Sequence, residues 1–145
     1  MSYTLVKDLH KDIKKYLKTE VKVGGWVRTS RDSKEFGFIE VNDGSFFKGI
    51  QVVFDSTLEN FEEVLKISVG SSLEVSGELV ESPAAGQPFE LKAKSIEIIN
   101  LAPTDYPLQK KRHSFEFLRE IAHLRGRSNT FSAVFRLRSV LSYAI

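Results

Sequence analysis

The spacing of hydrophobic and polar positions changes along the 145-residue chain. Near the start, Val6, Leu9 and Ile13 recur at spacings of three and four, with lysines largely on the other faces, so residues 4–19 are predicted to form an amphipathic helix with a basic outer side. From residue 21 to residue 99 the period falls to two, which is typical of β-strands. The five alternating runs are 21–28, 35–41, 48–55, 73–80 and 89–99.

One helix is expected between the third and fourth strands. Ser56 and Glu59 have the spacing of a capping box, and Gly70 follows the expected end of the helix. The apolar stripe between them is Leu58, Phe61 and Leu65. Five strands with a helix after the third give the element order of an OB-fold, a small Greek-key barrel. Gly24-Gly25 in the first strand would supply the bend that such a barrel needs, although a five-stranded SH3-like barrel or an open sheet also fits the pattern.

The alternation stops near residue 100, where residues 100–107 contain two prolines and no periodicity. Two helical segments are predicted after it, at 114–124 and 129–145. About thirty helical residues cannot close a core of their own, so we expect this chain to be the front part of a longer protein. The expected organisation is a mainly β domain at 1–100, a linker at 101–112 and the start of an α+β domain at 113–145.

Strand alternation also sorts side chains into an inward and an outward set. In the second strand Gly37, Ile39 and Val41 form the inward set. The outward set across the strands includes Phe36, Phe38, Gln51, Glu90, Arg28 and Trp26. Aromatic rings beside an amide, a carboxylate and arginines suit unpaired nucleotides, because bases stack on rings and polar groups contact base edges. The alternative is that the two phenylalanines pack under the first helix or a loop, and that Gln51 and Glu90 are merely solvated.

Charge adds a second observation. The chain has 21 Lys and Arg against 19 Asp and Glu, but residues 1–34 carry nine basic and four acidic side chains, 35–107 four and thirteen, and 108–145 eight and two. Two basic zones therefore flank an acidic middle, a distribution typical either of polyanion binding or of ordinary solvated faces.

Composition excludes several classes of function. The absence of cysteine excludes disulfides, thiolate metal sites and a cysteine nucleophile, and it fits a reducing cytoplasm. Three scattered histidines argue against a His-based metal site, and we expect His113 and His123 to be packing or capping residues. No apolar run approaches the roughly 20 residues that a membrane span needs, and no glycine-rich phosphate loop is present.

Several motifs resemble one enzyme family. They are Val23-Gly24-Gly25-Trp26-Val27-Arg28 with Arg31-Asp32, the run Phe38-Ile39-Glu40-Val41-Asn42-Asp43-Gly44-Ser45, the run Ile50-Gln51-Val52-Val53, and the Arg-x-Arg-x-Asn-Thr sequence of residues 125–130. Together they resemble the N-terminal portion of the asparaginyl-tRNA synthetases (asparagine–tRNA ligases), class II aminoacyl-tRNA synthetases of the aspartyl, lysyl and asparaginyl subgroup. The Asn-Asp-Gly-Ser sequence is similar to the asparaginyl branch in particular.

The resemblance implies an OB-fold that binds a tRNA anticodon loop, followed by a hinge and the first helices of a catalytic domain. It implies that Phe38 stacks on anticodon bases, that Gln51 hydrogen-bonds the central uridine, that Glu90 contacts a neighbouring base, and that Arg28 and Arg31 lie near the anticodon backbone. The family's whole enzyme uses ATP and Mg²⁺, and we expect it to be a cytoplasmic homodimer. The family's ATP-binding motifs lie further along its chain, so this chain alone is expected to bind RNA without catalysis.

Three other interpretations stay open at this point. An aspartyl-tRNA synthetase has a similar anticodon-binding domain. A free-standing OB-fold would bind single strands without base preference. A protein-interaction domain would bind no nucleic acid.

Overall fold

The computed structural model describes residues 2–33, 35–83 and 86–145. The chain divides into two compact units, Met1–Tyr106 and Pro107–Ile145, which are described separately.

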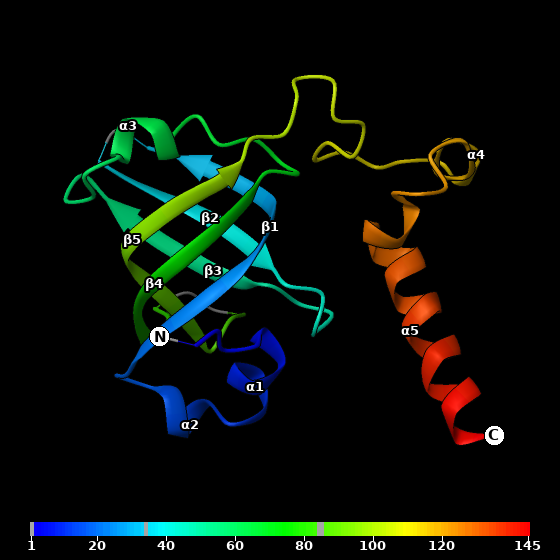
Figure 1. Cartoon of the computed structure of the whole chain (residues 1–145), viewed down its shortest axis with the longest axis horizontal. Helices are drawn as coiled ribbons and strands as arrows, with labels where there is room; N and C mark the ends of the chain where they lie inside the picture. The colour runs from blue at the N-terminus through cyan, green and yellow to red at the C-terminus, as the bar shows by residue number, and fades with distance from the viewer. Residues whose placement is uncertain (1, 34, 84–85) are drawn as a thin grey trace. The chain divides into compact units, whose positions relative to one another are not determined.

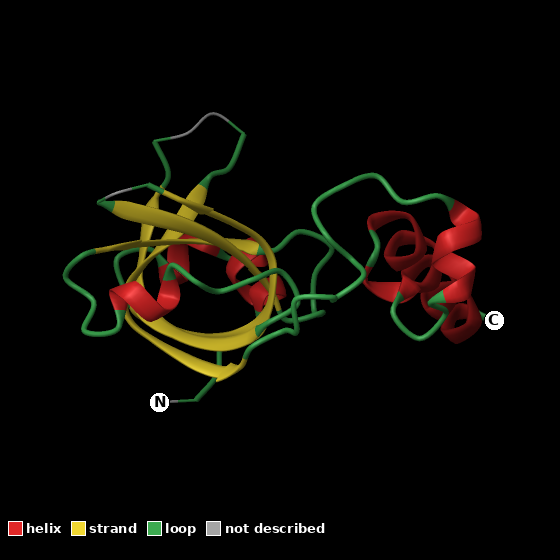
Figure 2. Cartoon of the chain, turned by 90° about the horizontal axis from the view of Figure 1, so that it is seen from above, coloured by secondary structure: helices red, strands yellow, loops and turns green. Residues whose placement is uncertain are grey.

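Five strands of the first unit close into a barrel. The strands are β1 (Glu20–Asp32), β2 (Phe36–Asn42), β3 (Ile50–Asp55), β4 (Ser72–Glu81) and β5 (Phe89–Asn100). Their order around the barrel is β1-β2-β3-β5-β4, with β3 and β5 parallel and the other neighbours antiparallel. The strands curve around a closed ring in Figure 2. This closure confirms the OB-fold and excludes the open sheet.

The first strand, β1, is long enough to pair with two neighbouring strands. It pairs with β4 over residues 20–26 and with β2 over residues 26–32, so it changes partner directly after Gly24-Gly25, where the sequence predicted a bend. The β1–β2 register then shifts between Val27 and Thr29, which places a bulge at Arg28. In the β4–β5 pair the register shifts between Ser76 and Gly77, which leaves Lys94 as an extra residue of β5 and places another bulge there.

The core lies inside the barrel and is built from the inward set of the alternation. One residue from each strand, Val23, Ile39, Val52, Leu79 and Leu91, is completely buried. Burial of such a side chain stabilises the fold by about 1.5–3 kcal/mol. In Figure 1 the first two helices lie at one end of the barrel and α3 at the other, and apolar side chains from α1 and α3 join the same core.

The predicted helix at 4–19 is two short helices, α1 (Val6–Lys11) and α2 (Ile13–Tyr16). Asp12 separates them with a φ of −138° and a ψ of 69°, outside the helical region. Its carboxylate accepts a hydrogen bond from the N–H of Lys15, so Asp12 caps the second helix. The apolar stripe was placed correctly, because Val6 and Leu9 are fully buried, but the helix was not continuous.

The predicted capping box at Ser56 and Glu59 is wrong. The helix α3 is a single turn, Phe61–Val64, and its N-cap residue is Asn60 without a side-chain hydrogen bond. Residues 56–60 form turns, since the carboxylate of Asp55 accepts the N–H of Thr57 at 3.0 Å and fixes the chain direction before a helix can begin.

The second unit contains α4 (Phe115–Glu120), a 3₁₀ turn η1 (Arg125–Arg127) and α5 (Asn129–Ala144). Ser114 caps α4 by accepting the N–H of Phe117 at 3.2 Å. The helix predicted at 114–124 ends at residue 120, and residues 121–124 form turns. The helix predicted from residue 129 is present. No helix in the described ranges is long and apolar enough to cross a membrane.

Candidate nucleic-acid interface

A hollow of about 1020 Å³ lies on the outer side of the barrel, in the first unit. We call it the groove. Its floor is the outward face of β2 and β3, and its rim comes from β1, α1, the start of β5 and the loops before β3 and β5. The side chains used below are His10, Arg31, Phe36, Phe38, Glu40, Phe46, Lys48, Gln51 and Glu90.

Phe38 lies in the middle of the groove floor. It is paired with Arg31 on β1 and with Val53 on β3, and it is half-buried. The ring of Phe36, 43% exposed, meets the ring of Phe38 edge to face, with centroids 5.5 Å apart and an interplanar angle of 85°. Neither ring is sealed beneath the first helix or a loop, so the packing alternative does not hold. The outward placement of both rings is confirmed.

Gln51 and Glu90 lie beside each other although 39 residues separate them. β3 and β5 pair in parallel, with Val52 opposite Leu91. The residues directly before these two, Gln51 and Glu90, therefore also lie side by side. Nε2 of Gln51 donates to Oε2 of Glu90 at 3.4 Å, and Oγ of Ser82 donates to the same oxygen at 3.1 Å. The pair offers an amide with donors and an acceptor beside a carboxylate that only accepts, which is a combination suited to a base edge.

The two arginines have different positions. Arg31 follows the bulge and lines the groove opposite Phe38. Arg28 occupies the bulge itself and is not among the lining residues of the groove. A bulge reverses which face successive side chains occupy, so Thr29 and Arg31 turn toward the groove. A contact between Arg28 and nucleic acid stays a prediction.

Sequence reasoning missed several side chains of the groove, among them His10, Phe46 and Lys48. Phe46 is 37% exposed, and its ring stacks on His10 with centroids 4.5 Å apart and an interplanar angle of 27°. An aromatic residue in a polar loop is a usable signal for Phe46. Nothing in the spacing of His10 relates it to a strand face more than 25 residues away, because only the tertiary fold brings α1 to the groove.

The groove combines rings, an amide and charges of both signs. Arg31 and Lys48 supply positive charge, and Glu40 and Glu90 supply negative charge. Within residues 2–33, 35–83 and 86–145 no group of three or more His, Cys, Asp or Glu side chains could hold a metal ion. The arrangement is therefore suited to stacking and hydrogen bonding with unpaired bases.

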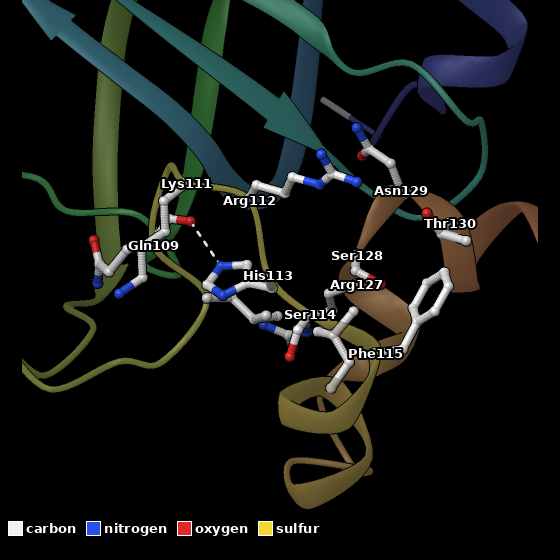
Figure 3. Close-up of a pocket in the computed structure, with 12 residues that line it drawn as sticks. Gln109, Lys111, Arg112, His113, Ser114, Phe115, Arg127, Ser128, Asn129 and Thr130 are labelled. Atoms are coloured by element: carbon white, nitrogen blue, oxygen red, sulfur yellow. Dashed lines mark hydrogen bonds between the residues drawn. The ribbon is translucent and has the colours of Figure 1, made fainter.

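A separate hollow of about 740 Å³ lies within the second unit, between the segment before α4 and the start of α5 (Figure 3). Its basic lining residues include Lys111, Arg112 and Arg127. His113 packs as predicted, with Nε2 3.0 Å from the carbonyl oxygen of Gln109 and its ring stacked on Phe117 at 5.2 Å. His123 is exposed in the turns after α4, so the packing role is wrong, and the capping role that was the other expectation stays a prediction.

Comparison with known proteins supports the fold and the family. Residues 21–99 match the tRNA anticodon family described as an OB-fold nucleic acid binding domain. Over 145 residues the chain is 64% identical to an asparagine–tRNA ligase from Desulfitobacterium hafniense (strain Y51), covering all of this chain and 31% of that protein. A second asparagine–tRNA ligase, from Acetivibrio thermocellus, is also 64% identical, with 32% of its length covered. The chain thus spans about a third of the length of these curated relatives.

Solved structures show the same fold. An asparaginyl-tRNA synthetase from Pyrococcus horikoshii, complexed with asparaginyl-adenylate, matches 99% of this chain and 33% of its own, with a TM-score of 0.84 and 21% identity. An aspartyl-tRNA synthetase from Entamoeba histolytica matches 96% of this chain and 35% of its own, with a TM-score of 0.75 and 19% identity. Fold similarity therefore extends to both kinds of enzyme.

Proposed function

The chain belongs to the family of OB-fold nucleic acid binding domains, and we propose that its groove binds the unpaired bases of a tRNA anticodon loop. The observation that carries this proposal is the convergence of Phe38, Gln51 and Glu90 on one hollow from three different strands. In this proposal Phe38 stacks on an anticodon base, Gln51 hydrogen-bonds the central uridine and Glu90 contacts the neighbouring base.

We further propose that the chain is the N-terminal part of an asparagine–tRNA ligase. The two relatives at 64% identity support this proposal. The whole enzyme would activate asparagine with ATP and Mg²⁺ and esterify it to tRNA(Asn), as a cytoplasmic homodimer. ATP would supply the energy of that activation, and the described part of this chain has no group suited to holding the metal. Its own residues contribute binding and base discrimination.

Affinity and discrimination come from different groups. Cations such as Arg31, Lys48 and the lysines of the first helices attract the phosphate backbone, a contribution that weakens as salt rises. Contacts with base edges by Gln51 and Glu90 provide choice among bases. The shared hydrogen bond between these two side chains holds them in place before RNA arrives, which reduces the entropy lost on binding.

A titration tests the proposal. The chain is titrated with an anticodon stem-loop of tRNA(Asn) and with the same stem-loop carrying a different central base, at several salt concentrations. We expect tighter binding to the native loop at every salt concentration. Indifference to the central base would favour a single-strand-binding OB-fold without base preference, and no binding at low salt would favour a protein-interaction domain.

Two substitutions separate stacking from base discrimination. We expect Phe38→Ala to weaken binding of both stem-loops by about 1–3 kcal/mol, because a stacking surface is lost. Gln51→Ala should mainly reduce the difference between the two loops. Glu62→Ala, an exposed change on α3 outside the groove, is the control. Equal effects of Phe38→Ala and Glu62→Ala would contradict the assignment.

The aspartyl alternative requires its own comparison. The anticodons of tRNA(Asn) and tRNA(Asp) share two of three bases, so the stem-loops of both are titrated against the chain. The identity to asparagine–tRNA ligases favours tighter binding of the tRNA(Asn) loop. Preference for the tRNA(Asp) loop would favour the aspartyl interpretation.

A further inference from the structure

The loop between β2 and β3 holds the beginning of α1. The residue before this helix is Leu5, which has no side-chain cap to offer. Instead the N–H of Val6 donates to Oδ2 of Asp43 at 2.9 Å, and the N–H of Lys7 donates to Oγ of Ser45 at 3.0 Å. Two side chains almost forty residues away therefore satisfy amides of the first turn, which otherwise lack partners.

The other end of α1 contacts the far end of the same loop. Nε2 of His10 lies 3.3 Å from the carbonyl oxygen of Gly49. One face of the His10 ring stacks on Phe46, and the ring also meets Phe89 of β5 at 4.9 Å with an interplanar angle of 59°. His10 thus lies between the loop and β5. We use the term clamp for these contacts between α1 and the loop: Val6 with Asp43, Lys7 with Ser45, and His10 with Phe46 and Gly49.

The loop also fixes its own path. Oδ1 of Asn42 accepts the N–H of Gly44 at 2.7 Å, and the amide of Asn42 donates to the carbonyl oxygen of Phe46 at 3.2 Å. Oδ1 of Asp43 accepts both the N–H and the Oγ–H of Ser45. Gly44 has a φ of +81°, which favours glycine. The carboxylate of Asp43 therefore joins loop and helix, one oxygen to each.

We propose that Phe46 is a second stacking group of the groove, in addition to Phe38, and that the clamp holds it there, with His10 and Asp43 as positioning residues. This inference rests on the proposed function, since its ligand is an unpaired base of the same RNA loop. Phe46 lines the groove and is partly exposed, and the ring of His10, which also lines the groove, stacks on one face of it. A ring held in place before binding loses less conformational entropy when a base stacks on it.

The first test compares two neighbouring phenylalanines. Phe46→Ala should weaken binding of the anticodon stem-loop RNA roughly 5- to 150-fold, the range that loss of one stacking contact gives. Phe47, the next residue, is 48% exposed but does not line the groove. Phe47→Ala is therefore the matched control and should change affinity less than about twofold. Equal weakening by both substitutions would overturn the inference.

A double-mutant cycle tests the positioning role of His10. His10→Ala should weaken binding in the wild-type background but add little in the Phe46→Ala background, because both changes remove the same contact. His10→Phe retains a ring stacked on Phe46 and should preserve most of the affinity. If His10 had a merely structural role, His10→Ala would weaken binding equally in both backgrounds. That result would overturn the positioning role proposed for His10.

Hydrogen exchange provides a readout for Asp43 that does not depend on RNA. In the free chain, Asp43→Ala should accelerate exchange of the backbone N–H groups of Val6 and Ser45, while those of the barrel strands stay protected. Unchanged exchange at both amides would overturn the role of Asp43.

If Phe46→Ala binds RNA as wild type does while Phe38→Ala loses affinity, the inference falls and the proposed function stands. If the wild-type chain does not bind the RNA, both fall.

Discussion

Phe38 shows how a single residue acquires its role from its neighbours. Strand alternation places it outward, between the buried neighbours Gly37 and Ile39. The strand order then places Arg31 and Val53 on its two sides. A ring at this position cannot enter the core, because a shift of one residue would also turn Ile39 and Val41 outward. The exposure of Phe38 is therefore maintained by the burial of its neighbours.

Gly37 gives a prediction at the same scale. It faces inward, and a Cβ atom there would overlap the ring of Phe54. We expect Gly37→Ala to lower the free energy of unfolding by about 1–3 kcal/mol, because overpacking displaces a buried ring. The measurement is urea unfolding followed by circular dichroism.

Gly24→Ala is the matched control in the neighbouring strand. Its Cβ would lie 3.1 Å from Cε1 of Tyr3, which is 54% exposed and can move away. Equal stability losses in the two variants would contradict the packing argument.

At the scale of elements, the strands were easier to predict than the helices. The two-residue period gave all five strands, with ends shifted by a few residues. The helices around them are short because carboxylates bind nearby backbone amides, at Asp12 as the cap of α2 and at Asp55 in the turn before α3. Such caps depend on which backbone amide a carboxylate reaches, and hydrophobic periodicity carries no information about that.

The turn after β3 gives a prediction of pH dependence. Hydrogen bonds to Asp55 from the hydroxyl and then the N–H of Thr57, helped by the charge of Lys92, hold the pKa of this carboxyl below its ordinary value of 3.8. A lowered pKa means that the ionised form stabilises the folded state, so this contribution is present above about pH 4 and is lost as pH falls further.

Asp55→Asn should therefore reduce the loss of thermal stability between about pH 4 and pH 2.5, by no more than about 0.5 kcal/mol, since the group is at the surface and screened. The measurement is the unfolding midpoint of both proteins across that range. Parallel pH profiles for the two proteins would contradict the assignment.

At the scale of the molecule, the two units differ in charge and in core. The buried apolar cluster lies entirely within the first unit, whereas the eight basic and two acidic side chains of residues 108–145 belong to the second. The first unit thus contains the whole groove and its own core. In the proposed function, the positive charge of the second unit would strengthen attraction to RNA without regard to sequence.

Truncation tests this division. We expect residues 1–106 alone to fold, with an unfolding midpoint within a few degrees of that of the whole chain, because no residue of the cluster is removed. The truncated chain should keep its preference for the native anticodon loop but bind more weakly at low salt, with a shallower salt dependence. Loss of the base preference on truncation would show that the second unit contributes to discrimination.

The sequence by itself determined the strand set, the inward and outward faces and the resemblance that pointed to RNA, because alternation and short motifs are local properties of the chain. Only the tertiary structure decided which outward residues meet. The parallel β3–β5 pair brings Gln51 to Glu90, and a bulge turns Arg31 into the groove and leaves Arg28 out of its lining. Likewise, the contact of His10 with Phe46 depends on chain closure over 36 residues, which no local pattern records.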